Sequence, residues 1–547
     1  MKKPIEAAGP ADPLQPERRA LMKLGAAAGI AAPMVSPWLM QAAQAAAAPA
    51  RGGTLNIVHG SINILNPAIQ SGIATMIPGA QLFAGLVEYD ANWKPHPYLA
   101  THWEQAADGL SHTFHLRQGA LFHDGHEITS EDVAFSLHIV KNYHPFGPAM
   151  FGSVDRVDTP DKYTAIIRLK QPLPALLVST SSVLLPIIPK HVYGVGDIHT
   201  NPANNRPVGS GPFKFQAYSP GEYLILERFD KFFRPGRPYL DRLVFHIMHD
   251  PNTSTLGMQR GKLDYMPYAP VTISDVERLA KTPHLAVTHG GYAAVGPLNW
   301  LAFNVRHKPL SDKRVRQAIA YASSRKFIVD DLFEGKAQIA TGPIAPSSPF
   351  YSPDVPMYTQ NLAKANALLD QAGYPKKADG TRFSLTLDVY PSMGQVGLAP
   401  AQYFKAQLPK VGIAVNIREA PDFPTWAHRM ANWDFELSMD EVYNYPDPTI
   451  GVQRTYMSTN IKHVVWSNTQ GYSNPHVDAL FEQAAHEGNF DKRKALYSEL
   501  QKILADDLPV YWINVIPYST VYNQKVQNVP LTIWGAMGPM DQVWLRA

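Results

Sequence analysis

Four histidines lie close together between residues 112 and 126, at positions His112, His115, His123 and His126. Imidazole nitrogens are common ligands of transition metals, so a group like this could form a metal site. His112 and His115, however, are three residues apart on a predicted strand, and side chains at that spacing point to opposite faces. The spacing therefore argues against a shared metal site, and we expect neither a metal nor another cofactor.

The chain contains no motif for covalent or phosphate chemistry. It has no G-x-S-x-G elbow, no G-x-x-x-x-G-K-[ST] loop and no H-E-x-x-H pair, and Gly194-Val195-Gly196 lacks the third glycine of a dinucleotide fingerprint. It also contains no cysteine, which removes disulfides, thiolate ligands and a cysteine nucleophile. We therefore do not expect an enzyme.

Aromatic residues are abundant, with 10 Trp, 25 Tyr and 22 Phe. Rigid rings with a few placed polar groups can line a cleft that binds an organic solute without reacting with it. Most of these rings should still belong to the core. The composition therefore permits a binding protein, and residue patterns must identify the site.

The elements around these histidines can be read from turn and capping signals. Asp108-Gly109 and Asp124-Gly125 are turn dipeptides, and Thr113 to Arg117 alternates as a half-buried strand does. Thr129 is a candidate N-cap with Asp132 three residues later, and apolar residues then recur at helical spacing. The segment is therefore predicted to run strand, turn, strand, helix.

The residues of this segment resemble a known family. From Pro97 the chain matches the order P-x-L-A-x-x-W, D-G, F-x-L-R-x-G, F-x-D-G, T-x-x-D-V, which is similar to the extracytoplasmic solute-binding proteins, family 5, of peptide and nickel ABC importers. Val208 to Phe213, followed by Pro220-Gly221-Glu222, resembles a second family segment. Leu301 to Asn304, followed by Pro309 to Ala318, resembles a third. The resemblance runs from about residue 52 to the C-terminus.

The resemblance implies an α/β fold of the two-lobed periplasmic-binding-protein type, class II, in its large form with an extra subdomain. Lobe I would comprise residues 52–290 and 508–547 with an insertion near 95–210, and lobe II residues 291–507. A solute that contacts both lobes would favour a hinge-closed form, which the importer's permease would then recognise. No bond would be made or broken.

The resemblance also implies where the ligand would be contacted. First-lobe candidates are Ser61, Asn63 and Phe83, and second-lobe candidates are Tyr292, Trp300, Asp440, Glu441, Tyr443 and Asn444. Ala84 replaces the glutamate of the family's F-E-G-L pattern, which makes the lining less acidic.

Peptide binders of the family carry an aspartate that binds the ligand's α-ammonium. Counted back from Asp447-Pro448 its place is held by Asn444, and counted forward from Asp434 it is held by Tyr443. Neither residue is acidic, so an ordinary peptide would need Asp440 or Glu441 as its anionic partner. The alternative is that these two acids lie on a solvated loop and that Asp447 only caps a turn.

Residues 1–45 resemble a twin-arginine export signal. Arg18-Arg19 precedes a weakly apolar run, Leu24 to Val35, and Ala43-Gln44-Ala45 offers a small-residue cleavage site. The apolar run is too short to cross a bilayer, which takes about 20 residues, so the protein should not be membrane-embedded. Because the chain has no cysteine for lipidation, we expect a free periplasmic protein of a Gram-negative cell.

Charge and length set the remaining expectations. A chain of 547 residues with 45% apolar and 17% charged residues can bury a large core. The net charge is +3, and the first 45 residues, with five cations and three anions, account for +2 of it, so nothing suggests nucleic acid as a partner. We expect a monomer that binds a peptide or another polar solute such as an opine. A nickel-type metal chelate carrier and a secreted hydrolase are the alternatives.

Overall fold

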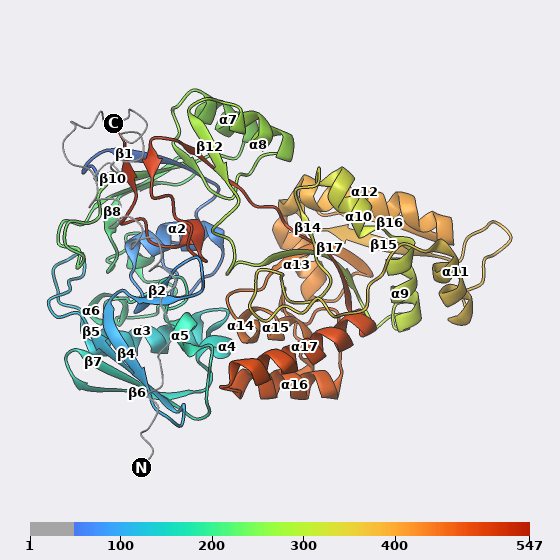
Figure 1. Cartoon of the computed structure of the whole chain (residues 1–547), viewed down its shortest axis with the longest axis horizontal. Helices are drawn as coiled ribbons and strands as arrows, with labels where there is room; N and C mark the ends of the chain where they lie inside the picture. The colour runs from blue at the N-terminus through green and yellow to red at the C-terminus, as the bar shows by residue number, and fades with distance from the viewer. Residues whose placement is uncertain (1–48, 547) are drawn as a thin grey trace, which may run out of the picture. The chain divides into compact units, whose positions relative to one another are not determined.

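The computed structural model describes residues 49–546, which form one unit organised around three larger β-sheets (Figure 1). The predicted export signal, residues 1–45, lies outside the described residues. Two short two-stranded ribbons complete the sheets: β2 (Val87–Tyr89) with β3 (Pro95–Pro97), and β20 (Val526–Gln527) with β21 (Trp544–Leu545).

The first sheet has seven strands and is built around the strand Thr54–His59. In spatial order its strands are β12 (Leu285–Thr288), β19 (Thr520–Asn523), β11 (Tyr265–Met266), β1 (Thr54–His59), β10 (Arg242–Ile247), β9 (Tyr223–Arg228) and β8 (Phe213–Ser219). β1 runs parallel to β10, with Ile57 opposite Phe245. β1 is therefore the central strand of this sheet.

The second sheet has six strands and carries most of the predicted site. In order they are β14 (Gln338–Ile339), β18 (Val510–Val515), β13 (Pro297–Phe303), β17 (Leu437–Tyr443), β15 (Phe383–Val389) and β16 (Ile413–Glu419). Every residue of β13 is buried, as expected for a strand covered on both faces. β13 lies between β17 and β18 and therefore fixes their separation.

The third sheet belongs to the segment read above as strand, turn, strand, helix. Its order is β4 (Ala100–Gln105), β5 (Ser111–Leu116), β7 (Thr164–Leu169) and β6 (Val154–Asp161). Helix α3 (Ser130–Tyr143) begins after the predicted N-cap Thr129, whose backbone N–H donates to Asp132 Oδ2 at 2.9 Å. The predicted capping box is confirmed.

Helices cover the sheets (Figure 1). Besides α3 they are α2 (Ile73–Leu82), α4 (Gly147–Phe151), α5 (Leu176–Ser179), α6 (Lys190–Tyr193), α7 (Pro251–Gln259), α8 (Ile273–Ala280), α9 (Lys313–Ala322), α10 (Arg325–Phe327), α11 (Leu362–Gln371), α12 (Gln395–Gln407), α13 (Phe423–Ala431), α14 (Pro448–Gly451), α15 (Gln453–Tyr456), α16 (Pro475–His486) and α17 (Phe490–Asp507).

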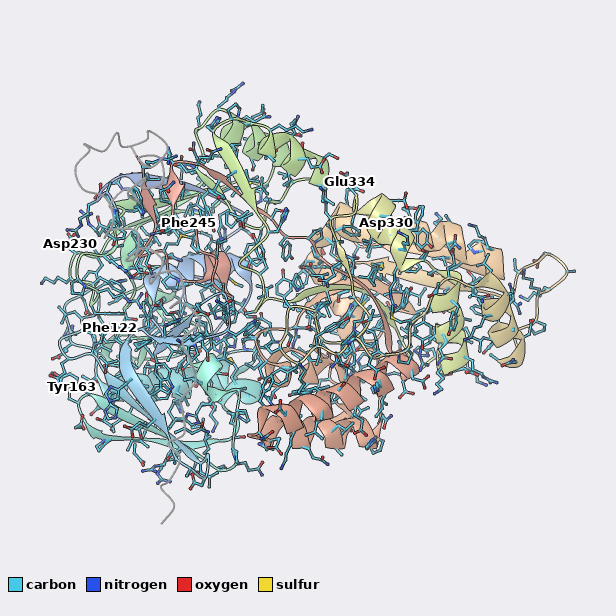
Figure 2. All side chains as sticks on the ribbon, in the orientation of Figure 1. Phe122, Tyr163, Asp230, Phe245, Asp330 and Glu334 are labelled. Carbon is cyan, nitrogen blue, oxygen red and sulfur yellow. The ribbon has the colours of Figure 1, made fainter. Side chains whose placement is uncertain are left out.

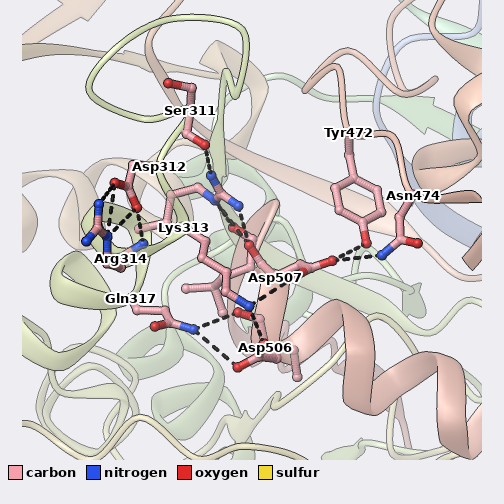
Figure 3. Close-up of polar contacts among 12 residues, drawn as sticks. Ser311, Asp312, Lys313, Arg314, Gln317, Tyr472, Asn474, Asp506 and Asp507 are labelled. Atoms are coloured by element: carbon pink, nitrogen blue, oxygen red, sulfur yellow. Dashed lines mark hydrogen bonds and ion pairs between the residues drawn. The ribbon is translucent and has the colours of Figure 1, made fainter. Parts of the chain in front are cut away.

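Polar contacts join the start of α9 to the end of α17 (Figure 3). Lys313 Nζ lies 2.7 Å from Asp506 Oδ2, and Gln317 donates to the Asp506 carbonyl at 2.8 Å. Asp507 Oδ2 accepts from Tyr472 at 2.6 Å and from Asn474 at 3.1 Å. These bonds anchor the chain just before it enters β18.

Two short segments carry the chain between the seven-stranded and six-stranded sheets. Residues 289–296 lead from β12 to β13, and residues 516–519 lead from β18 back to β19. Each of these two sheets has its own apolar interior. Phe245 of the seven-stranded half is fully buried, whereas the charged side chains of Asp230 and Asp330 are exposed (Figure 2). Any motion between the sheets must pass through these two segments.

A buried ion pair fixes the loop that follows β17. Asp447 is the N-cap of α14, and its carboxylate accepts two hydrogen bonds from Arg493 of α17, both at 2.7 Å. The side chains are only 6% and 4% exposed, and Arg493 also donates to Thr449. The loop 444–447 is therefore tied to α17, the longest helix of the six-stranded half.

Removing Asp447 should destabilise the protein strongly. Asp447→Ala leaves the buried Arg493 guanidinium without its counter-charge, which we expect to lower the free energy of unfolding by about 3–5 kcal/mol in urea titrations. Asp354→Ala is the matched control, because Asp354 pairs with Lys502 of the same helix at an exposed site. That change should cost about 1 kcal/mol or less. Equal small losses in the two variants would contradict this view of the loop.

Candidate ligand-binding site

Strand β17 presents two adjacent acids to opposite sides of the six-stranded sheet. Asp440 is paired in register with Trp300, and Glu441 with Asn299 of β13. Because side chains alternate along a strand, Asp440 and Glu441 point away from one another, and Tyr443 lies on the side of Glu441. The two carboxyls therefore belong to different environments.

Glu441 is surrounded by tyrosine hydroxyls. Its Oε1 accepts from Tyr443 at 3.5 Å and its Oε2 from Tyr518 at 3.4 Å, and the two hydroxyls lie 2.9 Å apart. Burial raises the pKa of Glu441 to about 7, and it raises the pKa of Tyr443 and Tyr518 well above the usual range. Within the described part of the chain, no lysine, arginine or histidine pairs with this carboxyl.

Two of the tyrosine rings grouped around Glu441 lie in the segments that cross between the sheets. Tyr292 lies in the first crossing and Tyr518 in the second, with ring centroids 5.6 Å apart. Tyr268 packs edge-on against both, at 4.9 and 5.0 Å. Tyr292 also shares a 2.5 Å hydrogen bond with Thr520 at the start of β19. The acid thus lies beside the segments about which the sheets would move.

Asp440 occupies a second buried polar cluster. Its Oδ1 accepts from the Glu441 backbone N–H at 2.7 Å and from the Trp466 indole at 3.4 Å. Burial raises its pKa well above the usual range, although the positive charge of Arg454 opposes the shift. Arg454 donates to the Trp466 carbonyl at 2.5 Å, and its Nε is buried without a hydrogen-bond partner among the described residues. Asp440 therefore has a cation nearby, unlike Glu441.

The loop after β17 also contacts the helical segment that follows α3. Phe146 stacks at a tilt against Tyr445, at 4.7 Å, and the Arg454 guanidinium lies 4.9 Å from the Phe146 ring centre. Tyr445 and Ile450 pack into the apolar interior of the seven-stranded half. Residues of the two halves therefore meet at this loop.

The amide of Asn444 is engaged by its own half of the protein. Its Oδ1 accepts from Ala345 N at 2.6 Å and its Nδ2 donates to the Pro343 carbonyl at 3.0 Å. Gly296 and Gly451 approach so closely that an added Cβ would lie 3.0 and 1.7 Å from Asn444 atoms. Asn444 is thus part of a tight backbone junction.

The other predicted contacts are distributed differently. Trp300 is 2% exposed with its ring edge toward Tyr456, and Phe83 is fully buried against Tyr193. Ser61 and Asn63 are exposed on the loop after β1. The structure brings Glu441, Tyr443 and Tyr292 into one cluster through Tyr518 and Tyr268. Contact of any of the nine predicted residues with a ligand stays a prediction.

Six residues around Glu441, around Asp440 and at the contact between the two halves were not identified from the sequence: Phe146, Tyr268, Tyr445, Arg454, Trp466 and Tyr518. Of these six, only Tyr445 lies within the segment 440–448, which the family resemblance indicated as a ligand contact region. The place of Tyr518 at the chain's return crossing is a signal that could have identified it.

Two hollows of the described surface lie away from this cluster. One of about 560 Å³ is an open depression on α16 and α17 that includes Gln483 and Glu499. The other, of about 40 Å³, lies beside Ser182 and Trp534. Neither is lined by a predicted contact residue, so the buried acid and its tyrosines define the candidate site.

The arrangement of two sheets joined by two crossing segments, with a polar aromatic cluster beside them, is that of a two-lobed solute-binding protein. Residues 94–463 match the family model of bacterial extracellular solute-binding proteins, family 5 (middle region). The chain belongs to this family.

Individual relatives agree with the family. The chain is 27% identical over 493 residues to the oligopeptide-binding protein AppA of Bacillus subtilis (strain 168), covering 86% of this chain and 87% of that one. The solved structure of AppA in complex with a nonapeptide matches with a TM-score of 0.79 at 25% identity, covering 91% of this chain and 100% of that chain. The protein AgaA of A. tumefaciens R10, in complex with agropinic acid, matches with a TM-score of 0.76 at 25% identity and covers 90% and 99%. The predicted fold is confirmed.

Across residues 49–546, no helix combines the length and apolar character that crossing a membrane requires.

The stability of the unliganded protein should depend on the ionisation of Glu441. Its pKa in the folded protein, about 7, lies above its ordinary value of 4.5, so the folded state takes up a proton that the unfolded state has lost. The stabilising effect of this proton is complete below about pH 4.5 and is lost as the pH rises to about 7. In urea titrations, the free energy of unfolding relative to Glu441→Gln should fall by about 3 kcal/mol across that window. A constant difference between the two proteins would contradict the assignment.

Proposed function

We propose that this chain is the solute-binding subunit of an ABC importer and that it carries a peptide, or a related polar solute, with a protonated amine. The observation that carries the proposal is the Glu441 carboxyl, which is buried among hydroxyls without a basic partner in the described residues. A buried carboxylate is costly when unpaired, and an ammonium group of the ligand supplies the missing charge.

The relatives support this ligand class. AppA is an oligopeptide-binding protein that has been seen with a nonapeptide, and AgaA has been seen with agropinic acid. The same fold thus accepts both peptides and another organic solute. The ammonium requirement at Glu441 is the element that we add for this chain.

The anchoring role falls to Glu441 and not to Asn444, the position reached by counting back from Asp447. Both polar atoms of the Asn444 amide are already bonded to the backbone of residues 343–345. Tyr443 and Tyr292 would complete the second-lobe wall around Glu441, whereas Asp440, on the opposite side of β17, would contact the solute only from its own cluster with Trp466.

Ser61 and Asn63 would contact the solute from the first lobe, where both are exposed. Contacts by Phe83 and Trp300 would require these packed side chains to rearrange on binding.

Transport would follow from the two crossing segments. A solute that contacts both lobes favours the closed arrangement by its differential affinity, and the permease recognises that arrangement. We propose that lobe I comprises residues 52–290 with 516–547, including an inserted subdomain near 95–210, and that lobe II comprises residues 291–515. The second boundary moves from the expected residue 508 to residue 516, because β18 (Val510–Val515) pairs with β13 in the six-stranded sheet. The protein would act as a monomer in the periplasm after twin-arginine export, and it would make or break no bond.

A matched pair of ligands tests the ammonium requirement. Protein freed of bound solute by unfolding and refolding is titrated calorimetrically with peptides of two to nine residues, each with a free and an acetylated N-terminus. We expect acetylation to weaken binding by at least 30-fold, because losing one partner of a buried charge pair costs about 2–5 kcal/mol.

Glu441→Gln should weaken binding of the free peptides by a similar factor and leave little further effect of acetylation. Glu499→Gln, an exposed acid on α17, is the control and should leave binding unchanged. An unchanged acetylation effect in Glu441→Gln would exclude Glu441 as the anchor.

Titrations of the same solute-free protein also distinguish the two alternatives, a metal chelate carrier and a hydrolase. A metal chelate carrier would be stabilised by a nickel–histidine complex and not by peptides. A hydrolase would cleave the peptides during titration, which mass spectrometry of the recovered ligand would detect. Stabilisation by about 2.7 kcal/mol at a hundredfold excess over the Kd, with intact ligand recovered, is the result expected here.

A further inference from the structure

The four histidines near residue 112 separate into different environments in the folded protein. His112 is buried, and neither of its ring nitrogens has a hydrogen-bond partner among the described residues. His123 bonds to the backbone of Gly209 and Gly211. His115 is half-buried and lies near His102 and Glu104, whereas His126 is exposed and lies near Asp124 and His191. The four histidines do not form one metal site, but two of them lie in smaller groups that contain a second histidine and an acid.

We propose that His102, Glu104 and His115 form a binding site for a borderline divalent transition ion such as Zn²⁺ on the outer face of the four-stranded sheet. One nitrogen or oxygen of each side chain lies within 4.8 Å of those of the other two. Two imidazoles and a carboxylate are a ligand set that zinc accepts, whereas calcium and magnesium prefer oxygen ligands only.

The backbone of the site is set by strand register. His102 of β4 is the direct partner of His115 of β5, and Glu104 lies two residues further along β4, hence on the same face. The opposite face of these strands is buried through Phe114 and Leu116. The three Cα positions are thus held by a packed sheet, and only the side chains have to adjust.

The distances fit that adjustment. Tetrahedral zinc with bonds near 2.0–2.1 Å separates its ligand atoms by roughly 3.3 Å, so the side chains must approach one another by about 1.5 Å at most. The rings of His102 and His115 are stacked with centroids 4.2 Å apart. His102 and Glu104 are exposed, so rotation about their side-chain bonds meets little resistance.

Thr101 prepares His102 for metal binding. Its hydroxyl donates to the His115 carbonyl at 3.1 Å and lies 3.0 Å from His102 Nδ1. A hydroxyl has one proton, so satisfying both contacts requires His102 Nδ1 to carry the proton of the second bond. The lone pair of His102 is then on Nε2, the free nitrogen, in the arrangement by which outer partners orient metal-binding histidines.

A second surface group, Asp124, His126 and His191, is less suited to a metal. The Asp124 carboxylate already lies 2.6 Å from His191 Nε2 and 3.3 Å from His126 Nδ1, so a metal would have to break this pairing. In the first group, no hydrogen bond or ion pair of the Glu104 carboxylate occurs among residues 49–546. The second group therefore serves as the internal comparison.

Calorimetric titration of the tag-free, chelator-treated protein with Zn²⁺ tests the proposal. We expect one site, weakened at least tenfold in His102→Ala, in His115→Ala and in Glu104→Gln. The double variant His126→Ala/His191→Ala should bind as the wild type does. Circular dichroism of the metal-free variants confirms that each is folded, which exposed positions should permit.

Two further readouts distinguish the site from loose surface association. Thr101→Val should weaken Zn²⁺ about tenfold although residue 101 binds no metal in this arrangement. Co²⁺ should give the visible bands of a low-coordinate site in the wild type and not in His115→Ala. No Zn²⁺ binding at 100 μM, or binding lost only in the His126/His191 variant, would overturn the proposal.

Discussion

The buried carboxyl of Glu441 imposes the constraint that organises this molecule. It needs two hydroxyls, one from its own strand and one from Tyr518, which belongs to the segment that leaves the six-stranded sheet. Both can reach it because β13 separates β17 from β18 by one strand, with Asn299 paired to Glu441 on one side and to Asn514 on the other. A slip of register by one residue would turn Glu441 and Tyr443 together to the other face and leave Tyr518 without either partner. The hydrogen bonds of Glu441 therefore require this strand order and this register.

The loop that follows β17 is held by contacts made inside the six-stranded half, and this leaves its ring side chains free to meet the other half. Asp447 is fixed by Arg493, and Asn444 is fixed by the backbone near residue 344. Tyr445, between them, reaches Phe146. A rigid loop that presents an aromatic side chain across a boundary can transmit closure, because its own position does not change when the halves separate. This rigidity depends on the buried ion pair between Asp447 and Arg493, because losing either partner would leave the other charge buried and unpaired.

Sequence patterns predicted what is decided locally. The strand over Thr113 to Arg117 and the capping box at Thr129 depend on neighbours within a few residues, and the structure has both, the strand as β5 (Ser111–Leu116). The family resemblance placed the segment 440–448, but counting along it could not choose between Tyr443 and Asn444. Strand alternation decides how Asp440 and Glu441 differ, and long-range pairing supplies Tyr518 and Arg454. These contacts join residues far apart in sequence, and no local pattern encodes them.

The buried site around Glu441 and the surface site around Glu104 suit different cations for a physical reason. Around Glu441, burial raises the pKa of the tyrosines, so their hydroxyls stay neutral and are weak metal ligands but good hydrogen-bond partners for an ammonium group. Around Glu104, the side chains are open to water and include two imidazoles, whose lone pairs bind a transition ion better than an ammonium group. An organic cation should therefore select the first site and a metal ion the second. Zinc bound to the four-stranded sheet would then leave the affinity for a peptide unchanged, because its ligands include none of the residues around Glu441.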